Sequence, residues 1–112
     1  MIDRAIHYIL EGKTTRQTDF LTWAMWYERA DRTVAHTEID NIIVSTVFFG
    51  LDFSLGNENV PMLFETMILG GELDGSKVRC STWEQAEQLH DRYVAMVVAG
   101  REDDTLEAEI IG

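Results

Sequence analysis

The sequence predicts an α+β domain in which two helices pack on a small antiparallel sheet of three to four strands. Two β-prone segments joined by a short turn, residues 34–39 and 42–50, predict the sheet. Two segments with helical apolar spacing, residues 20–30 and 81–99, predict the helices. The 112 residues are 46% hydrophobic, which suits one core. We therefore expect a single domain over residues 1–100 and an acidic tail over residues 101–112.

The first part of the chain holds one ambiguous segment and one helix. Residues 6–10 form a short apolar run before a turn-like stretch, and they suit either a strand or the start of a helix. Thr18 is the expected N-cap of the helix over 20–30, with Asp19 placed favourably for the helix dipole. Apolar residues extend well around this helix, including Leu21 and Met25, so it needs cover on more than one side. A symmetric homodimer is one predicted way to provide that cover.

The predicted sheet occupies the middle of the chain. Asp40-Asn41 suits a two-residue turn, so residues 34–39 and 42–50 should pair antiparallel. Residues 42–50 are apolar on both faces, which is typical of a central strand. A loop over 52–59 leads to a third strand over 62–69, which ends at Gly70-Gly71.

The second helix should begin at the capping box formed by Ser81 and Glu84 and end at Gly100 as its C-cap. The face that should pack on the sheet carries Ala86, Leu89, His90, Tyr93, Met96 and Val97. After Gly100, the sequence becomes strongly acidic and predicts either a frayed tail or a partner-binding segment. The candidate partner-binding residues there are Glu102, Asp103, Asp104, Glu107 and Glu109.

The charge of the chain restricts its partners. Nine Lys and Arg against twenty Asp and Glu give a net charge of −11, and no basic cluster is present. Direct binding to nucleic acid or to an anionic membrane is therefore not expected, whereas a basic surface on another protein is a suitable partner. Cys80 is the single cysteine, and residues 1–10 lack the unbroken apolar run of a signal peptide, so we predict a cytoplasmic protein.

Two residues are weak candidates for catalysis. Glu65 shares a predicted strand face with apolar residues, so burial would require a cationic partner, such as Arg79 or Arg92, or would raise its pKa. His90 lies on the apolar face of the second helix, where it would be a core histidine or an acid–base partner of Glu65, or would bond the hydroxyls of Ser45 and Thr46. The sheet face with Thr46, Glu65 and His90 is the alternative ligand-binding site.

Other kinds of site lack a pattern in the sequence. His7, His36, His90 and Cys80 have no metal-ligand spacing, and the glycines form no phosphate-binding loop, so neither a metal nor a cofactor is predicted. An enzyme is therefore a less favoured prediction than a binding protein.

Residues 43–97 contain four motifs in a fixed order, namely residues 44–52, Leu63-Phe64-Glu65-Thr66-Met67, Gly70-Gly71 and residues 81–87. In the order of these motifs the segment resembles short proteins encoded by bacteriophages and prophages. The resemblance implies a compact fold in a bacterial host but carries no catalytic residues. Together with the acidic charge, it leads us to expect a non-catalytic interaction protein that inhibits a host defence complex, such as a CRISPR or restriction system. A protein that binds a small molecule or nucleotide is the alternative, and a small enzyme using Glu65 and His90 is the third.

Overall fold

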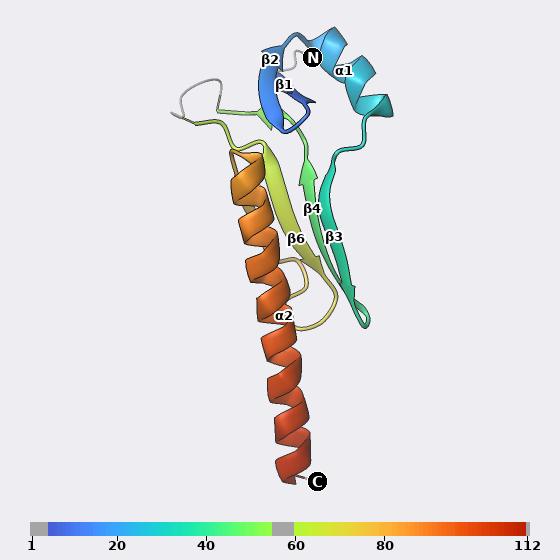
Figure 1. The fold of residues 1–112 in the computed structure, drawn as a ribbon, viewed down its shortest axis with the longest axis vertical. Coiled ribbons are helices and arrows are strands. Elements are labelled where there is room, and N and C mark those ends of the chain that lie inside the picture. Colours follow the sequence, from blue (N-terminus) through green and yellow to red (C-terminus); the bar gives the residue numbers. More distant parts are fainter. Residues whose placement is uncertain (1–4, 55–59, 112) are drawn as a thin grey trace.

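The computed structural model describes residues 5–54 and 60–111, and the side chains of 101–111 lie outside that description. It has two helices and two antiparallel sheets, which confirms the predicted α+β class (Figure 1). The strands are β1 (Ile6–Glu11), β2 (Thr14–Thr18), β3 (Thr33–Ile39), β4 (Ile42–Phe48), β5 (Leu51–Asp52), β6 (Phe64–Leu69) and β7 (Lys77–Cys80). The helices are α1 (Phe20–Arg29) and α2 (Trp83–Ile111).

The larger sheet has the strand order β3-β4-β6-β7, and every neighbouring pair is antiparallel. The prediction that residues 42–50 form a central strand is confirmed, because β4 lies between β3 and β6. α2 runs along one face of this sheet and contacts all four strands (Figure 1). The apolar face of the second helix therefore meets the sheet, as its spacing predicted.

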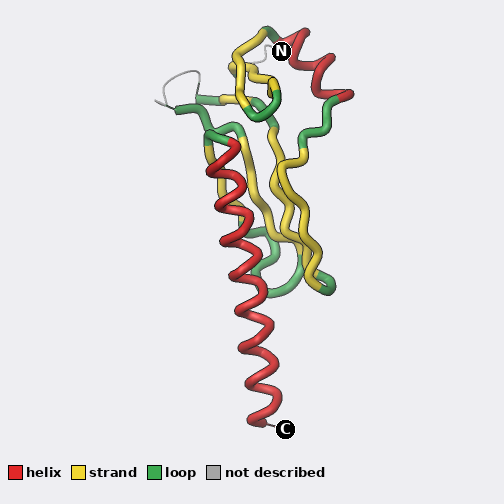
Figure 2. The backbone as a smooth tube through the Cα atoms, viewed as in Figure 1, coloured by secondary structure: helices red, strands yellow, loops and turns green. Residues whose placement is uncertain are grey.

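The smaller sheet has the order β2-β1-β5, and α1 lies mainly against β1. The ambiguous segment 6–10 is thus a strand. Both helices were expected on one sheet, but α1 lies against the smaller sheet and α2 against the larger one. A backbone bond from the Tyr8 amide to the Gly50 carbonyl (2.8 Å) and an edge-to-face contact between Trp26 and Phe48 join this part to the larger sheet. Figure 2 shows the two sheets following one another along the molecule.

Three strands were not expected from the sequence. β2 has the sequence TTRQT, and β7 has KVRC, and neither contains the apolar run by which strands are recognised. Both form because a more strongly β-prone neighbour, β1 or β6, offers them unpaired backbone groups. β5 has only two residues and pairs with β1.

The N-cap of each helix lies one residue later than predicted, although α1 begins at Phe20 as expected. The N-cap of α1 is Asp19 rather than Thr18, since the Asp19 carboxylate accepts the Thr22 amide at 2.8 Å. At α2, the Gln85 amide donates to Thr82 Oγ1 (3.1 Å), while Gln85 Oε1 accepts the Thr82 amide (3.3 Å). The capping box is therefore Thr82 with Gln85, and the assignment to Ser81 and Glu84 was wrong by one residue.

The expected end of the second helix at Gly100 was also wrong, because α2 continues to Ile111. Glycine inside a helix is less favourable than alanine by about 1 kcal/mol, which does not suffice to stop a helix flanked by good helix formers. The molecule is consequently elongated, with extents of 59 × 28 × 28 Å. Figure 1 shows the last turns of α2 extending beyond the end of the larger sheet.

The core between α2 and the larger sheet consists of two apolar clusters. One contains Phe48, Leu63, Phe64, Cys80 and Ala86. The other contains Val44, Ile68 and Val97. Along β4 and β6 the residues between these clusters on the same face are Thr46 and Thr66, which form a registered pair.

Candidate functional site

A polar layer separates the two apolar clusters, and it consists of Thr37, Thr46, Thr66 and His90. Strand alternation brings the threonines of β4 and β6 to the face that α2 covers, and β3 adds Thr37. α2 supplies His90 one helical turn after the buried Ala86. The sequence-predicted Thr46 and His90 are thus brought together.

Every hydroxyl of this layer is hydrogen-bonded. Thr46 Oγ1 lies 2.7 Å from Thr66 Oγ1 and 2.8 Å from His90 Nδ1. The other ring nitrogen, His90 Nε2, lies 2.8 Å from Thr37 Oγ1. A neutral imidazole satisfies this arrangement, because one ring nitrogen donates a hydrogen bond and the other accepts one.

The surroundings favour that neutral form. Burial lowers the pKa of His90 below its ordinary value of 6.5, and the nearby His36 lowers it further, against an opposing effect of the Asp91 carboxylate. His90 is only 3% exposed, so its imidazole has little contact with water that could stabilise the cation.

The polar layer has a hydroxyl and a neutral histidine, as a nucleophilic site does, but a substrate has no access to them. A hydroxyl lies within hydrogen-bond distance of a neutral histidine, which is how a base activates a nucleophile. Thr46 is completely buried and Thr66 is 1% exposed, however, so a substrate cannot reach either hydroxyl without separating α2 from the sheet. The arrangement therefore suits a packing role, in which the hydrogen bonds fix the position of the helix over the strands.

Glu65 lies on the opposite face of the sheet from His90. It is paired with Val47 and Arg79 across the sheet, between positions that face α2. Its carboxylate Oε2 accepts a hydrogen bond from Arg79 Nε at 3.0 Å, which is the ion pair considered as the alternative to catalysis. Thr46, Glu65 and His90 therefore do not line one pocket, and Glu65 and His90 do not form an acid–base pair.

The sequence contained a signal for the missed partners of His90. Thr66 occurs between Phe64 and Ile68 in β6, so alternation places its hydroxyl on an otherwise apolar face. A buried hydroxyl requires a polar partner, which points to the histidine on the apolar face of α2. Ser45, also considered as a partner, lies at the intervening position of β4, on the other face.

The exposed side of α2 carries a row of three carboxylates, formed by Glu84, Glu87 and Asp91 and called here the acidic row. Their spacing of three and four residues places them along one stripe of the helix. All three residues are exposed. The candidate partner-binding residues Glu102, Asp103, Asp104, Glu107 and Glu109 belong to the same helix, but their side chains lie outside the described residues.

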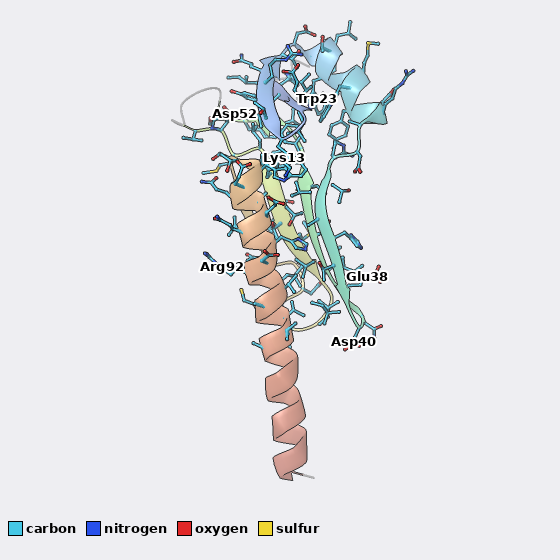
Figure 3. The ribbon with its side chains drawn as sticks, in the orientation of Figure 1. Lys13, Trp23, Glu38, Asp40, Asp52 and Arg92 are labelled. Atoms are coloured by element: carbon cyan, nitrogen blue, oxygen red, sulfur yellow. The ribbon has the colours of Figure 1, made fainter. Side chains whose placement is uncertain are left out.

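Other described carboxylates lie on separate elements. Glu38 and Asp40 are at the end of the β3–β4 hairpin, while Asp52 is a buried residue of β5 in the smaller sheet (Figure 3). Arg92 points away from the sheet on α2, and Lys13 lies near the start of that helix, over the Trp83 ring (Figure 3). Among the described residues, the acidic row is therefore the place where several exposed carboxylates lie along one helix.

Neither a metal centre nor a reactive thiol emerges from the described side chains. No three His, Cys, Asp or Glu residues among them gather as a metal ion would require. Cys80 is 6% exposed, and burial raises the pKa of its thiol, which disfavours the reactive thiolate. Within the described chain, no helix is both long enough and apolar enough to cross a membrane.

Comparison with protein-family models, curated proteins and solved structures gives no match for this chain. The resemblance to phage-encoded proteins stays a prediction, and the geometry of the molecule itself has to support any assignment of function.

Proposed function

We propose that the chain is a non-catalytic interaction protein that binds a basic surface of a partner protein through the exposed side of α2. The observation that carries this proposal is the acidic row on a 29-residue helix that extends beyond its own sheet. Five further carboxylates follow Gly100 in the same helix. A negatively charged row of this kind attracts a basic groove over long range and aligns the partner along the helix.

The sealed polar layer supports a binding role over an enzymatic one. The hydroxyl–histidine contacts that resemble catalytic chemistry, made by His90 with Thr46 and Thr37, belong to this layer, in which Thr46 and His90 are buried. Surface carboxylates, by contrast, need no pocket to steer a partner. A host defence complex that holds DNA or RNA in a basic groove is the partner class to examine first, because its groove is already suited to a polyanion.

The test is affinity capture from a bacterial lysate at low and high salt, followed by competition with labelled duplex DNA for the captured protein. The acidic row is neutralised in the variant Glu84→Gln, Glu87→Gln, Asp91→Asn. A matched control removes three charges elsewhere, through Glu28→Gln, Glu38→Gln and Asp40→Asn. We expect to capture a DNA-binding protein that labelled DNA displaces from the chain and that is lost at high salt. The acidic-row variant should capture at least about tenfold less of this protein, whereas the control variant should capture as much as the unchanged chain does.

Two outcomes would contradict the proposal. One is capture of a partner that the acidic-row variant retains as well as the control variant does. The other is the absence of any captured protein that DNA displaces, at either salt concentration.

A further inference from the structure

The larger sheet has a second face. α2 packs against one face, and among the described residues no helix lies against the other. Buried residues alternate with partly exposed ones along β4 and β6, because successive side chains point to opposite faces. The apolar residues of the uncovered face, called here the open strip, are Ile43, Val47, Met67 and Leu69. Ile43 is registered with Leu69, and the other two lie in the next rows of the same strand pair.

The charged side chains around the open strip balance one another. Glu65 pairs with Arg79 through a contact of 3.0 Å. Lys77 flanks the strip on β7, and Glu38 flanks it on β3. This face therefore carries as many described carboxylates as Lys and Arg side chains, although the whole chain has a net charge of −11. A second copy of the chain meets less repulsion here than on the acidic side of α2.

α1 carries another apolar surface that the described part of its own chain leaves uncovered. Phe20, Leu21 and Met25 are each more than half exposed. Ring contacts of His7 with Phe20 (5.5 Å) and Trp23 (5.2 Å) hold the helix against β1. Figure 1 shows α1 beyond the end of the larger sheet and away from α2. The helix therefore does not cover the open strip of its own chain.

The areas of the two surfaces indicate how they are covered. Phe20, Leu21 and Met25 can bury roughly 300–400 Å² per copy, taking about 200 Å² for a fully exposed large side chain. A stable interface buries about 800 Å² per partner, so contact between two copies of α1 alone is too small. The open face of the four-stranded sheet is about 20 Å wide and about 20 Å long, which adds roughly 400 Å². The two surfaces together supply the area that a dimer needs.

We propose that two copies of the chain form a two-fold dimer in which α1 of each copy packs on the open strip of the other. The symmetry makes the two contacts equivalent and leaves neither apolar surface exposed. The ten residues of α1 span about 15 Å, which fits the length of the face. Because α2 covers the opposite face of each sheet, both acidic rows stay on the outside of the dimer.

Sedimentation equilibrium of two double variants is the first test. The helix variant is Leu21→Lys, Met25→Lys, and the strip variant is Met67→Lys, Leu69→Lys. Each should weaken the dimer at least about tenfold, because each replaces apolar contacts by charges that the partner copy would bury.

Mixing the two variants distinguishes this arrangement from other dimers. One copy of each, when they associate, retain one intact contact, made by α1 of the strip variant and the open strip of the helix variant. A dimer of either variant with itself retains none. We expect the amide NMR signals of α1 in isotope-labelled strip variant to shift in a saturable manner when unlabelled helix variant is added. Unlabelled strip variant should produce no such shifts.

A matched control places the same charges elsewhere. Gln88→Lys, Ala95→Lys adds two lysines at exposed positions of α2 and should not weaken the dimer. Circular dichroism shows whether each variant is folded. If the strip variant does not fold, Leu69→Lys alone takes its place, because Leu69 is 43% exposed at the end of β6. This single change should weaken the dimer at least about threefold.

Four results would overturn the inference. A strip variant that associates as strongly as the unchanged chain would leave α1 packing on α1. An unaffected helix variant would point to contact between two sheets. Loss of the dimer in both variants without recovery on mixing would show that the two surfaces do not meet, and a chain that is monomeric at every concentration would exclude the dimer itself. The capture test of the acidic row is independent of all four, since α2 lies outside this contact.

Discussion

His90 places a neutral imidazole between two apolar clusters, where an aliphatic residue would seem the simpler choice for packing. Its two ring nitrogens hold threonines on β3 and β4, so the helix meets the sheet at one height only. Sliding α2 by one turn would leave these buried groups without partners, at about 1–3 kcal/mol each. The polar layer therefore contributes to the specificity of packing.

The protonation of His90 should make stability depend on pH. Its folded pKa is lowered relative to the unfolded chain, so the unfolded state binds the proton more readily as the pH falls below the ordinary value of 6.5. Stability is then greatest above that value and declines as the pH falls toward the folded pKa. We expect the urea concentration at the unfolding midpoint to decrease as the pH is lowered from about 7.5 to about 5.

Variants at two histidines test this assignment. His90→Gln should be less stable at neutral pH, because the polar layer is disturbed, and should lose part of the pH dependence. His36→Gln is the comparison: His36 is exposed on β3 and has the smallest of the three effects on the pKa of His90, so this variant should reduce the pH dependence only slightly. An undiminished decline in His90→Gln would show that other groups cause it.

At the scale of single elements, the start of α2 depends on Thr82 and Gln85, because their groups bond each other reciprocally. Thr82→Ala and Gln85→Ala should each lower the free energy of unfolding by about 1 kcal/mol. Glu84→Gln keeps the side-chain length and should cost only a few tenths of a kcal/mol. Urea denaturation checks the ranking, and an effect of Glu84→Gln as large as the other two would favour the box predicted from the sequence.

Gly100 distinguishes a continuous helix from one that ends there. If α2 runs through this position, Gly100→Ala should stabilise the protein by up to about 1 kcal/mol. Gly75→Ala is a suitable control, because Gly75 also has open space but a φ of +86°, so alanine there should be destabilising. Circular dichroism and urea unfolding measure both effects, and a destabilising Gly100→Ala would restore Gly100 as a C-cap.

For the whole molecule, self-association through α1 stays a prediction that the exposed residues of this helix make specific. Phe20, Leu21 and Met25 are 54%, 65% and 64% exposed. We expect a dimer in sedimentation equilibrium that strengthens with added salt, because screening reduces the repulsion between two chains of net charge −11.

Substitution on α1 provides the test of this dimer. The double variant Leu21→Lys, Met25→Lys should weaken association by at least about tenfold, since charges would replace the apolar contact. Glu28→Lys changes the charge of the same helix without removing apolar surface, and it should not reduce the association. A chain that is monomeric at every concentration would contradict the prediction.

The sequence determined the features that depend on neighbouring residues. The β3–β4 hairpin, the central position of β4 and the amphipathic face of α2 all follow from spacing within short segments. The sequence also indicated Thr46 and His90 as possible partners, because a histidine on an apolar helix face needs a polar group opposite it.

The tertiary structure decided the features that depend on residues far apart in the chain. β2 and β7 are too polar to predict alone, and they become strands because β1 and β6 supply hydrogen-bond partners. Strand register placed Glu65 on the face of the sheet opposite His90. It also brought Thr37 and Thr66 into the polar layer. Local pattern gives the faces of each element, whereas pairing and packing determine which faces meet, since those contacts form only when the whole chain folds.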